Sequence, residues 1–175
     1  PTAPAPASGY PVLVYAHGTG GSFNGQMGTG GYAQEVATGT TPAVTLAIDL
    51  PQHGERRGDS QEEPKNLFFN FLNPRAGRDN ALQGAADLMS VVKWARAGGI
   101  GAGESPTGKA IAFDPAHLVL FGHSQGATHA ALMASHEPGA VGVVLSGVGG
   151  HIATSMMTKT SPVDITAAVP IALLD

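Results

Sequence analysis

The chain has 175 residues, the size of one domain; only 13% of them are charged, and the formal net charge is −4. The nine Lys and Arg residues are scattered, so no basic stripe favours nucleic acid as a partner. No apolar run approaches the roughly 18 residues needed to cross a membrane, and the lack of cysteine excludes disulfides and thiol chemistry.

The first nine residues, PTAPAPASG, form a Pro/Ala-rich tract that is typical of an extended linker. Such a tract often follows a removed export signal or a lipid anchor. We therefore expect a linker over residues 1–9, a folded domain over 10–175, and a protein that is secreted, periplasmic or lipid-anchored at a cell surface.

Apolar segments alternate with segments of helical spacing along the domain. The apolar segments are nearly continuous, as is typical of strands buried on both faces of a parallel sheet, and they span residues 10–17, 43–50, 116–122 and 140–147. The helical spacing covers residues 78–97 and 124–137, with a shorter helix around 32–37. This alternation predicts an α/β fold, a mostly parallel sheet with flanking helices.

A long connection over residues 51–77 interrupts this rhythm. It begins polar and then concentrates aromatic side chains at Phe68, Phe69 and Phe71. Connections of this length are usually functional or disordered, and disordered segments are poor in aromatics. Two interpretations stay open: the phenylalanines form a small satellite core, or they form an apolar wall of a substrate cleft.

The stretch FGHSQGATHAA places Ser124 between Gly122 and Gly126, at a predicted junction of a strand and a helix. A sharp turn there would raise the serine oxygen above the carboxyl end of the strand, and glycines would avoid collisions across the turn. The same turn would point the N-terminus of the new helix at the reacting centre, where N–H groups stabilise negative charge. A buried structural serine is the alternative.

A second donor for that negative charge is expected from HGTGG, which follows the first predicted strand. The N–H of Thr19 would act with the N–H of Gln125, the residue after the serine, with Gly18 and Gly20 as near alternatives. The sequence does not favour a nucleotide-binding loop, because Phe23 occupies the third glycine position of a dinucleotide fingerprint and no Gly-Lys-Ser/Thr follows.

The ordered series of strand–HGTGG, strand–DLPQHGE and strand–GHSQGA resembles the α/β-hydrolase superfamily over roughly residues 10–150. Within that superfamily the set is similar to bacterial serine esterases and lipases. The resemblance implies Ser124 as nucleophile, Thr19 and Gln125 as oxyanion-hole donors, and no cofactor. We further expect the substrate to contact the neighbours of these residues and the aromatic cluster of the long connection. These substrate-binding residues are His17, Gly18, His123, Phe68, Phe69 and Phe71.

The resemblance also implies that Asp49 and His53 shape a loop near the site rather than take part in catalysis. A metal site formed by His17, Asp49 and His53 is the alternative interpretation of these residues, but all three stand where ordinary hydrolase loops place them.

The resemblance implies a catalytic acid and then a histidine after the serine. His129 and His136 belong to the predicted helix that leaves the serine, so we expect them on the helix surface. His151 follows the next strand but leaves no acid at the usual place before it. The stretch 161–175, ending at Asp175, is compatible with a further strand or a helix. We therefore expect the acid and histidine in a C-terminal remainder of the hydrolase outside this chain, possibly a separate chain.

These observations predict a serine hydrolase that cleaves a small-molecule or lipid-like carboxylic ester through an acyl-enzyme on Ser124. Thioesterase or peptidase activity is the nearest enzymatic alternative, because function depends on the site rather than on the fold. A non-catalytic α/β-hydrolase scaffold that binds a ligand or a partner is the alternative from another class.

Overall fold

The computed structural model describes residues 1, 3–151, 154, 158–161 and 164–167. Strands, helices and short 3-10 turns (η) alternate along the chain. Their bounds are β1 (Tyr10–Ala16), η1 (Phe23–Gln26), α1 (Tyr32–Thr38), β2 (Val44–Ala47), η2 (Gly54–Arg57), α2 (Pro64–Phe69), α3 (Pro74–Arg96), β3 (Gly99–Ile100), β4 (Ile111–His123), α4 (Gln125–Ala134) and β5 (Gly142–Ser146).

The strands form one mostly parallel sheet, as predicted. β1 lies between β2 and β4 and is parallel to both, and β5 is parallel to the other side of β4. Only the short β3 pairs antiparallel, with the start of β4. Parallel neighbours require crossover connections, which α1, α2 with α3, and α4 provide. The described chain is therefore an α/β fold in which the carboxyl ends of β1 and β4 lie side by side.

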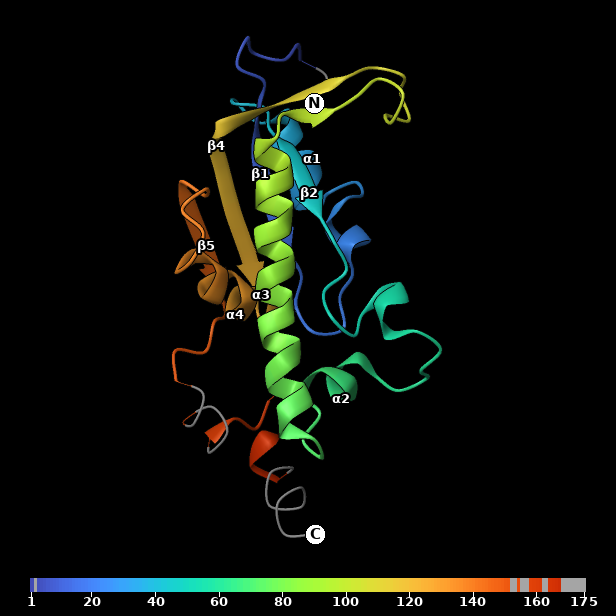
Figure 1. The fold of residues 1–175 in the computed structure, drawn as a ribbon, viewed down its shortest axis with the longest axis vertical. Helices are drawn as coiled ribbons and strands as arrows, with labels where there is room; N and C mark the ends of the chain where they lie inside the picture. The colour runs from blue at the N-terminus through green and yellow to red at the C-terminus, as the bar shows by residue number, and fades with distance from the viewer. Residues whose placement is uncertain (2, 152–153, 155–157, 162–163, 168–175) are drawn as a thin grey trace.

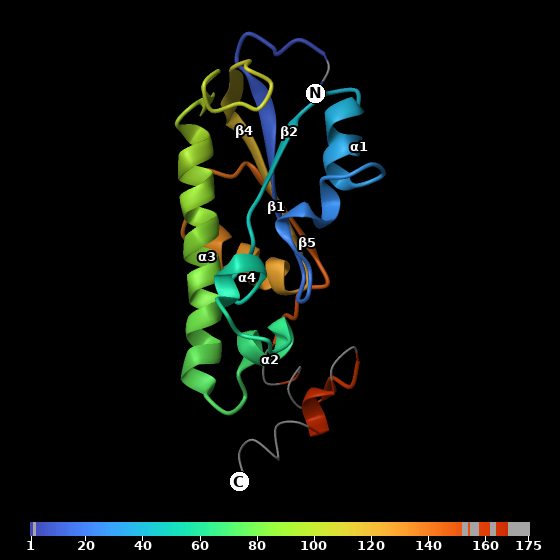
Figure 2. The ribbon, with the colours of Figure 1, turned by 90° about the vertical axis from the view of Figure 1, so that its right-hand side faces the viewer.

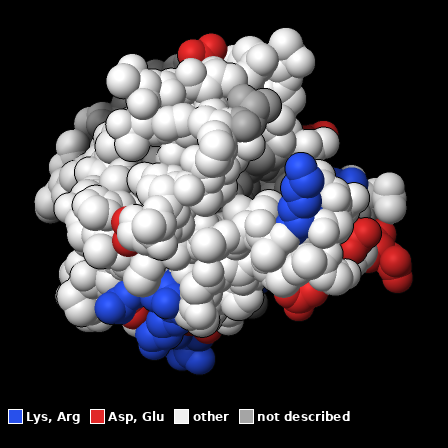
Figure 3. Space-filling view, turned by 90° about the horizontal axis from the view of Figure 1, so that it is seen from above, with Lys and Arg blue, Asp and Glu red and all other residues white. Residues whose placement is uncertain are grey.

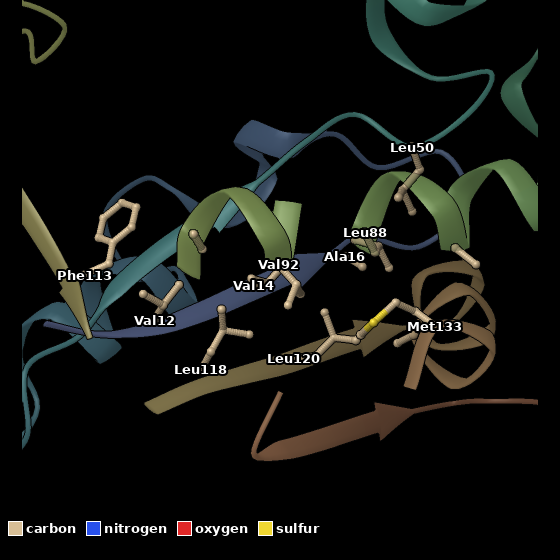
Figure 4. Packing of buried hydrophobic residues seen from close by; sticks show 13 residues of the cluster. Val12, Val14, Ala16, Leu50, Leu88, Val92, Phe113, Leu118, Leu120 and Met133 are labelled. Atoms are coloured by element: carbon tan, nitrogen blue, oxygen red, sulfur yellow. The ribbon is translucent and has the colours of Figure 1, made fainter. Parts of the chain in front are cut away.

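Helices cover both faces of this sheet. The long α3 and the shorter α4 lie on one face, and α1 lies on the other, as the two side views show (Figure 1, Figure 2). On the α1 face, Tyr32 packs against Tyr15 of β1 and Phe121 of β4, with ring centroids 5.7 and 4.9 Å apart. The main core fills the α3/α4 face, where side chains of both helices meet Val12, Val14, Leu118 and Leu120 of β1 and β4 (Figure 4).

The predicted elements all occur, but several boundaries differ. The helix predicted over 78–97 begins earlier, at Pro74, because the side chain of Asn73 accepts a hydrogen bond from the N–H of Ala76 and caps the first turn. The helix predicted over 124–137 ends at Ala134, and the strand predicted over 43–50 is shortened to Val44–Ala47.

The prediction that each strand is buried on both faces is wrong for β5. Val143, Val144 and Leu145 are 36%, 52% and 39% exposed. β5 pairs with β4 along one edge, and among the described residues no strand pairs with the other edge of β5. The apolar composition of β5 therefore does not measure its burial within the described part of the chain.

The long connection over residues 51–77 is ordered by contacts with α3. Arg56 of η2 makes a 2.6 Å ion pair with Asp87 of α3. The Asn80 side chain of α3 donates hydrogen bonds to the carbonyl oxygens of Leu67 and Phe68, at 3.1 and 3.0 Å. The connection therefore consists of η2, α2 and the first turn of α3, held against one helix.

The surface carries few charged side chains, in line with the low charge content of the sequence. The face seen in Figure 3 is mostly uncharged, with a few small, separate groups of basic and acidic side chains. Among the described residues, no helix is both long enough and apolar enough to cross a membrane.

Residues 165–167 are helical, whereas 162–163 and 168–175, including Asp175, lie outside the described residues.

A candidate active site around Ser124

The turn between β4 and α4 holds Ser124 in an unusual backbone conformation. Its φ is +52° and its ψ is −113°, values that L residues rarely adopt. Such strain persists only where neighbouring contacts hold it. Here the N–H of Ser124 donates to the carbonyl oxygen of Ser146 in β5 at 2.7 Å, and the N–H of Gly126 donates to that of His17 at 3.0 Å.

Steric crowding explains the two glycines of this turn. A Cβ on Gly122 would lie 2.5 Å from the carbonyl oxygen of Gly126 and 2.6 Å from the Cα of Ala127. A Cβ on Gly126 would collide with the carbonyl group of Ala16, with its carbon only 2.5 Å away. These obstacles are backbone atoms, so no rotamer change relieves them. Glycine is therefore required on both sides of Ser124.

The backbone N–H groups near Ser124 differ in whether they are already hydrogen-bonded. Among the described residues, neither Thr19 nor Gln125 donates its N–H to another protein group. Gly20 differs, because its N–H donates to Nε2 of His53 at 2.9 Å. The N–H of Gly21 is also used, by the carbonyl oxygen of Gly18. Of the alternatives from sequence, Gly20 is thus committed elsewhere, whereas Thr19 and Gly18 donate their N–H groups to no other described protein group.

A cavity of about 310 Å³ opens beside Ser124. The sequence-predicted residues His17, Gly18, Thr19, His123 and Ser124 all line it, and the rest of its lining is Tyr15, Gly21, Ser22, Gly25 and Gln26. Ser124 is half-buried, so its side chain is neither sealed in the interior nor fully in solvent. The structure thus brings together residues from the ends of β1 and β4, as the sequence predicted.

The three phenylalanines do not line this cavity. Phe68 is buried and packs edge-on against His129, with ring centroids 5.4 Å apart. Phe69 stacks on Phe71, at a centroid distance of 5.9 Å. The satellite-core interpretation therefore accounts for Phe68, and contact of Phe69 or Phe71 with a substrate stays a prediction.

The expectation that His129 lies on a helix surface is wrong, because its side chain is completely buried. α4 packs directly against α3, and Gly84 of α3 leaves space for the imidazole: a Cβ there would lie 2.5 Å from Nδ1 of His129. Burial lowers the pKa of His129 to about 4, so the ring is neutral near pH 7. His136, by contrast, is exposed as expected.

Two further buried histidines, His17 and His53, support the loops around the cavity. Nδ1 of His17 faces the carbonyl oxygen of Gly18, and Nδ1 of His53 faces that of Pro51. In both rings, Nε2 accepts a hydrogen bond from a backbone N–H. Burial lowers the pKa of both rings. Because both ring nitrogens are already used, neither histidine has a free lone pair for a metal ion. Within the described residues, no group of three or more His, Asp and Glu side chains is arranged to hold one.

Asp49 supports the loop after β1 rather than the cavity. Its side chain accepts a hydrogen bond from the N–H of Phe23 at 2.9 Å, and Nε2 of His17 is 3.9 Å from the same oxygen. Its backbone carbonyl accepts a hydrogen bond from Arg56 at 2.8 Å. These contacts agree with a loop-shaping role for Asp49.

No described histidine is hydrogen-bonded to the Ser124 hydroxyl. Nδ1 of His123 is 3.1 Å from the hydroxyl of Ser146, and Nδ1 of His151 accepts the N–H of Thr154 at 3.1 Å. The described site therefore combines a strained, accessible serine with nearby N–H donors at Thr19 and Gln125 that bond no other described group, but it includes no hydrogen bond between Ser124 and a histidine.

The comparisons with known proteins add no assignment to this geometry: no family model matches the chain, and no curated protein matches it.

Sequence reasoning also missed the buried position of His129 and its close packing against Gly84. A glycine inside a long helix was a usable signal, because it costs about 1 kcal/mol relative to alanine and is kept where close packing needs it.

Proposed function

We propose that this protein is a serine hydrolase of α/β-hydrolase type that cleaves carboxylic esters through an acyl-enzyme on Ser124. The observation that carries the proposal is the conformation of Ser124, a non-glycine residue at φ +52° whose side chain lines an open cavity. Backbone strain at such a position needs compensation from its surroundings and clusters at active sites.

In this proposal the Ser124 oxygen attacks the ester carbonyl carbon while its proton passes to a histidine. That histidine and the carboxylate that orients it are assigned to residues outside those described. The carbonyl oxygen becomes an oxyanion that accepts hydrogen bonds from the N–H groups of Thr19 and Gln125. Collapse breaks the bond to the alcohol, which takes the proton from the histidine. Water then attacks the acyl-enzyme by the same route and releases the acid.

The cavity that the described residues form beside Ser124 is small. At about 310 Å³ it lies at the small end of the usual range for ligand pockets, roughly 300–1,000 Å³. Its lining includes Tyr15 together with the polar residues Gln26 and Ser22. Small-molecule esters with short acyl chains are therefore the first substrates to test.

Covalent labelling of the full protein by a fluorophosphonate tests the proposal. We expect one phosphonyl adduct, located at Ser124 by peptide mass spectrometry, and no adduct in Ser124→Ala. Ser135→Ala is the matched control, because Ser135 is an exposed serine at the end of the same helix, where its hydroxyl bonds only the carbonyl of Leu132. It should label like the native protein.

A non-catalytic scaffold of the same type is the second candidate. The observation in its favour is the absence, among the described residues, of a hydrogen bond between Ser124 and any histidine. A folded protein that binds a short-chain ester, neither hydrolyses it nor reacts with the fluorophosphonate, and shows native unfolding behaviour would replace the hydrolase proposal with this one.

A further inference from the structure

We propose that His129 is a positioning residue that fixes the oxyanion hole through the side chains of Gln125 and Thr19. The inference rests on the proposed function and deepens it, because it names a buried group that acts on the site without touching the substrate. It begins from a chain of three hydrogen bonds that joins α3, α4 and the loop after β1.

The direction of this chain is set at its buried end. Nδ1 of His129 lies 3.0 Å from the carbonyl oxygen of Ala81 in α3. A backbone carbonyl can only accept, so Nδ1 must carry the proton, and the neutral ring then presents a lone pair at Nε2. Gln125 has its amide nitrogen 3.3 Å from that Nε2, and it donates to it.

The orientation of Gln125 then determines the role of Thr19. With its NH₂ group turned to His129, the amide presents its oxygen to the other side, where the hydroxyl of Thr19 donates to it at 2.9 Å. Reversing the amide would place its NH₂ against the hydroxyl and its oxygen against a lone pair of His129. The carbonyl of Ala81 thus determines which group donates in each of the three hydrogen bonds, up to the hydroxyl of Thr19.

Thr19 and Gln125 are also the two residues proposed to stabilise the oxyanion, and neither donates its N–H to another described protein group. The bond between their side chains ties the loop after β1 to the N-terminus of α4, which sets where one N–H lies relative to the other. On the far side of Thr19, the N–H of Gly20 is held by His53. Oxyanion stabilisation depends on such preorganised geometry, and an error of about 1 Å can cost roughly a hundredfold in rate.

His129 is suited to this role because its ring cannot swing away. Gly84 and Phe68 close around it, and its side chain has no exposed surface. Burial also keeps the ring neutral, since it lowers the pKa of His129 to about 4. One consequence is specific: the hydroxyl of Thr19 is used by Gln125, so the hole has two N–H donors and the hydroxyl is not a third.

The first test does not depend on activity. In ¹⁵N-histidine NMR spectra of the full protein at pH 7, we expect His129 to show a protonated Nδ1 and an unprotonated, hydrogen-bonded Nε2. Thr19→Val removes the hydroxyl but keeps the shape, and it should shift the Nε2 resonance of His129 because Gln125 loses its other partner. A proton on Nε2, a charged ring, or an unmoved resonance would overturn the chain of bonds.

The second test uses ester turnover. We expect Thr19→Val to lower kcat by about 10- to 100-fold with little change in KM, because a displaced oxyanion donor acts on the transition state. Thr19→Ser restores the hydroxyl and should recover most of that loss. Thr38→Val is the matched control, since it deletes a hydroxyl that bonds only the carbonyl of Gln34 on the surface of α1; it should leave kcat unchanged.

His129→Phe completes the argument, because it keeps a ring but offers no acceptor to Gln125. If His129 acts through Thr19, the double variant with Thr19→Val should lose little more kcat than either single variant. Full additivity, or native kcat in Thr19→Val, would overturn the positioning role. Should His129→Phe fail to fold, the kcat values of Thr19→Val and Thr19→Ser and the NMR signature still test the positioning role. A native protein that shows the NMR signature but never reacts at Ser124 would instead refute the proposed function.

Discussion

The turn between β4 and α4 and the loop after β1 line the same cavity, but different forces hold them. In the turn, Gly122 and Gly126 are surrounded by backbone atoms that leave no space for a side chain. In the loop, Gly20 has open space around it, and the side chains of His53 and Gln125 hold the segment by hydrogen bonds. Steric restraint is insensitive to pH, whereas restraint by buried histidines depends on their protonation. The two halves of one site should therefore fail under different conditions.

The largest effect is expected from Gly126→Ala. The new Cβ would meet the carbonyl group of Ala16 and would lie 2.7 Å from the carbonyl oxygen of His17, so strands and helix must move apart. We expect a loss of about 4 kcal/mol or more in unfolding free energy, or no folded protein, measured by urea denaturation.

Gly28→Ala is the control for this substitution, because no heavy atom lies within 4 Å of a Cβ there. It should change the unfolding free energy by no more than about 0.5 kcal/mol. Native stability in Gly126→Ala would mean that the turn has room that its geometry does not show.

The next largest effect is expected from acid, which should destabilise the part of the site that buried histidines hold. The pKa of His129 is about 4 in the folded protein, and an unfolded histidine titrates near 6.5. Between these values the unfolded chain binds more protons, so the contribution of His129 is complete above pH 6.5 and is lost as the pH falls toward 4. Over that window it amounts to about 3 kcal/mol.

Two variants separate His129 from the other titrating groups. Asp87 opposes the lowering of the His129 pKa, whereas His17 and His53 add to it, and both of these rings have lowered pKa values themselves. Urea unfolding at pH 7.5 and 4.5 should show the full loss in His136→Gln, which changes an exposed ring. His129→Phe should show a smaller loss. Equal losses in both variants would assign the acid sensitivity to other groups.

How far the sequence predicts this site depends on how local each determinant is. The turn at Ser124 was predictable because its strand, its glycines and its helix all lie within one short stretch, and the crowding at Gly122 comes from Gly126 and Ala127 of the same turn, although the atoms that crowd Gly126 belong to Ala16 and His17. The burial of His129 was not, because the space that receives its ring is made by Gly84, in another helix. The orientation of Gln125 likewise depends on the carbonyl of Ala81, and nothing in the residues around 125 indicates it.

The same distinction explains the strands. The apolar run of β1 indicated burial, and Val12, Val14 and Ala16 are buried under α3 and α4, whereas Leu13 on the other face is only partly buried. The run in β5 is equally apolar, yet Val144 is 52% exposed. Composition predicts that a segment will be a strand, but its burial depends on which other segments reach it.

A smaller effect is expected from Gly84→Ala, which alters the socket of His129 from the α3 side. A Cβ at position 84 would press on the imidazole, and the gain in helix propensity, about 1 kcal/mol, offsets part of the strain. We expect a net loss of about 1–2 kcal/mol in urea denaturation, with a changed ¹⁵N spectrum of His129. A more stable variant with an unchanged spectrum would show that the packing of α3 against His129 is loose.

The smallest effect is expected from Gly20→Ala, the counterpart of Gly126→Ala on the other side of the cavity. Gly20 has a φ of +81°, which alanine adopts at a cost of about 1–2 kcal/mol, but no atom lies within 4 Å of the added Cβ. Its N–H remains available to His53, so the acid sensitivity should match that of the native protein. We expect about 1 kcal/mol less stability at pH 7.5 and the same further loss at pH 4.5, measured by urea unfolding. A loss as large as that of Gly126→Ala would mean that the loop, like the turn, is fixed by steric exclusion, and the contrast between the two sides of the site would disappear.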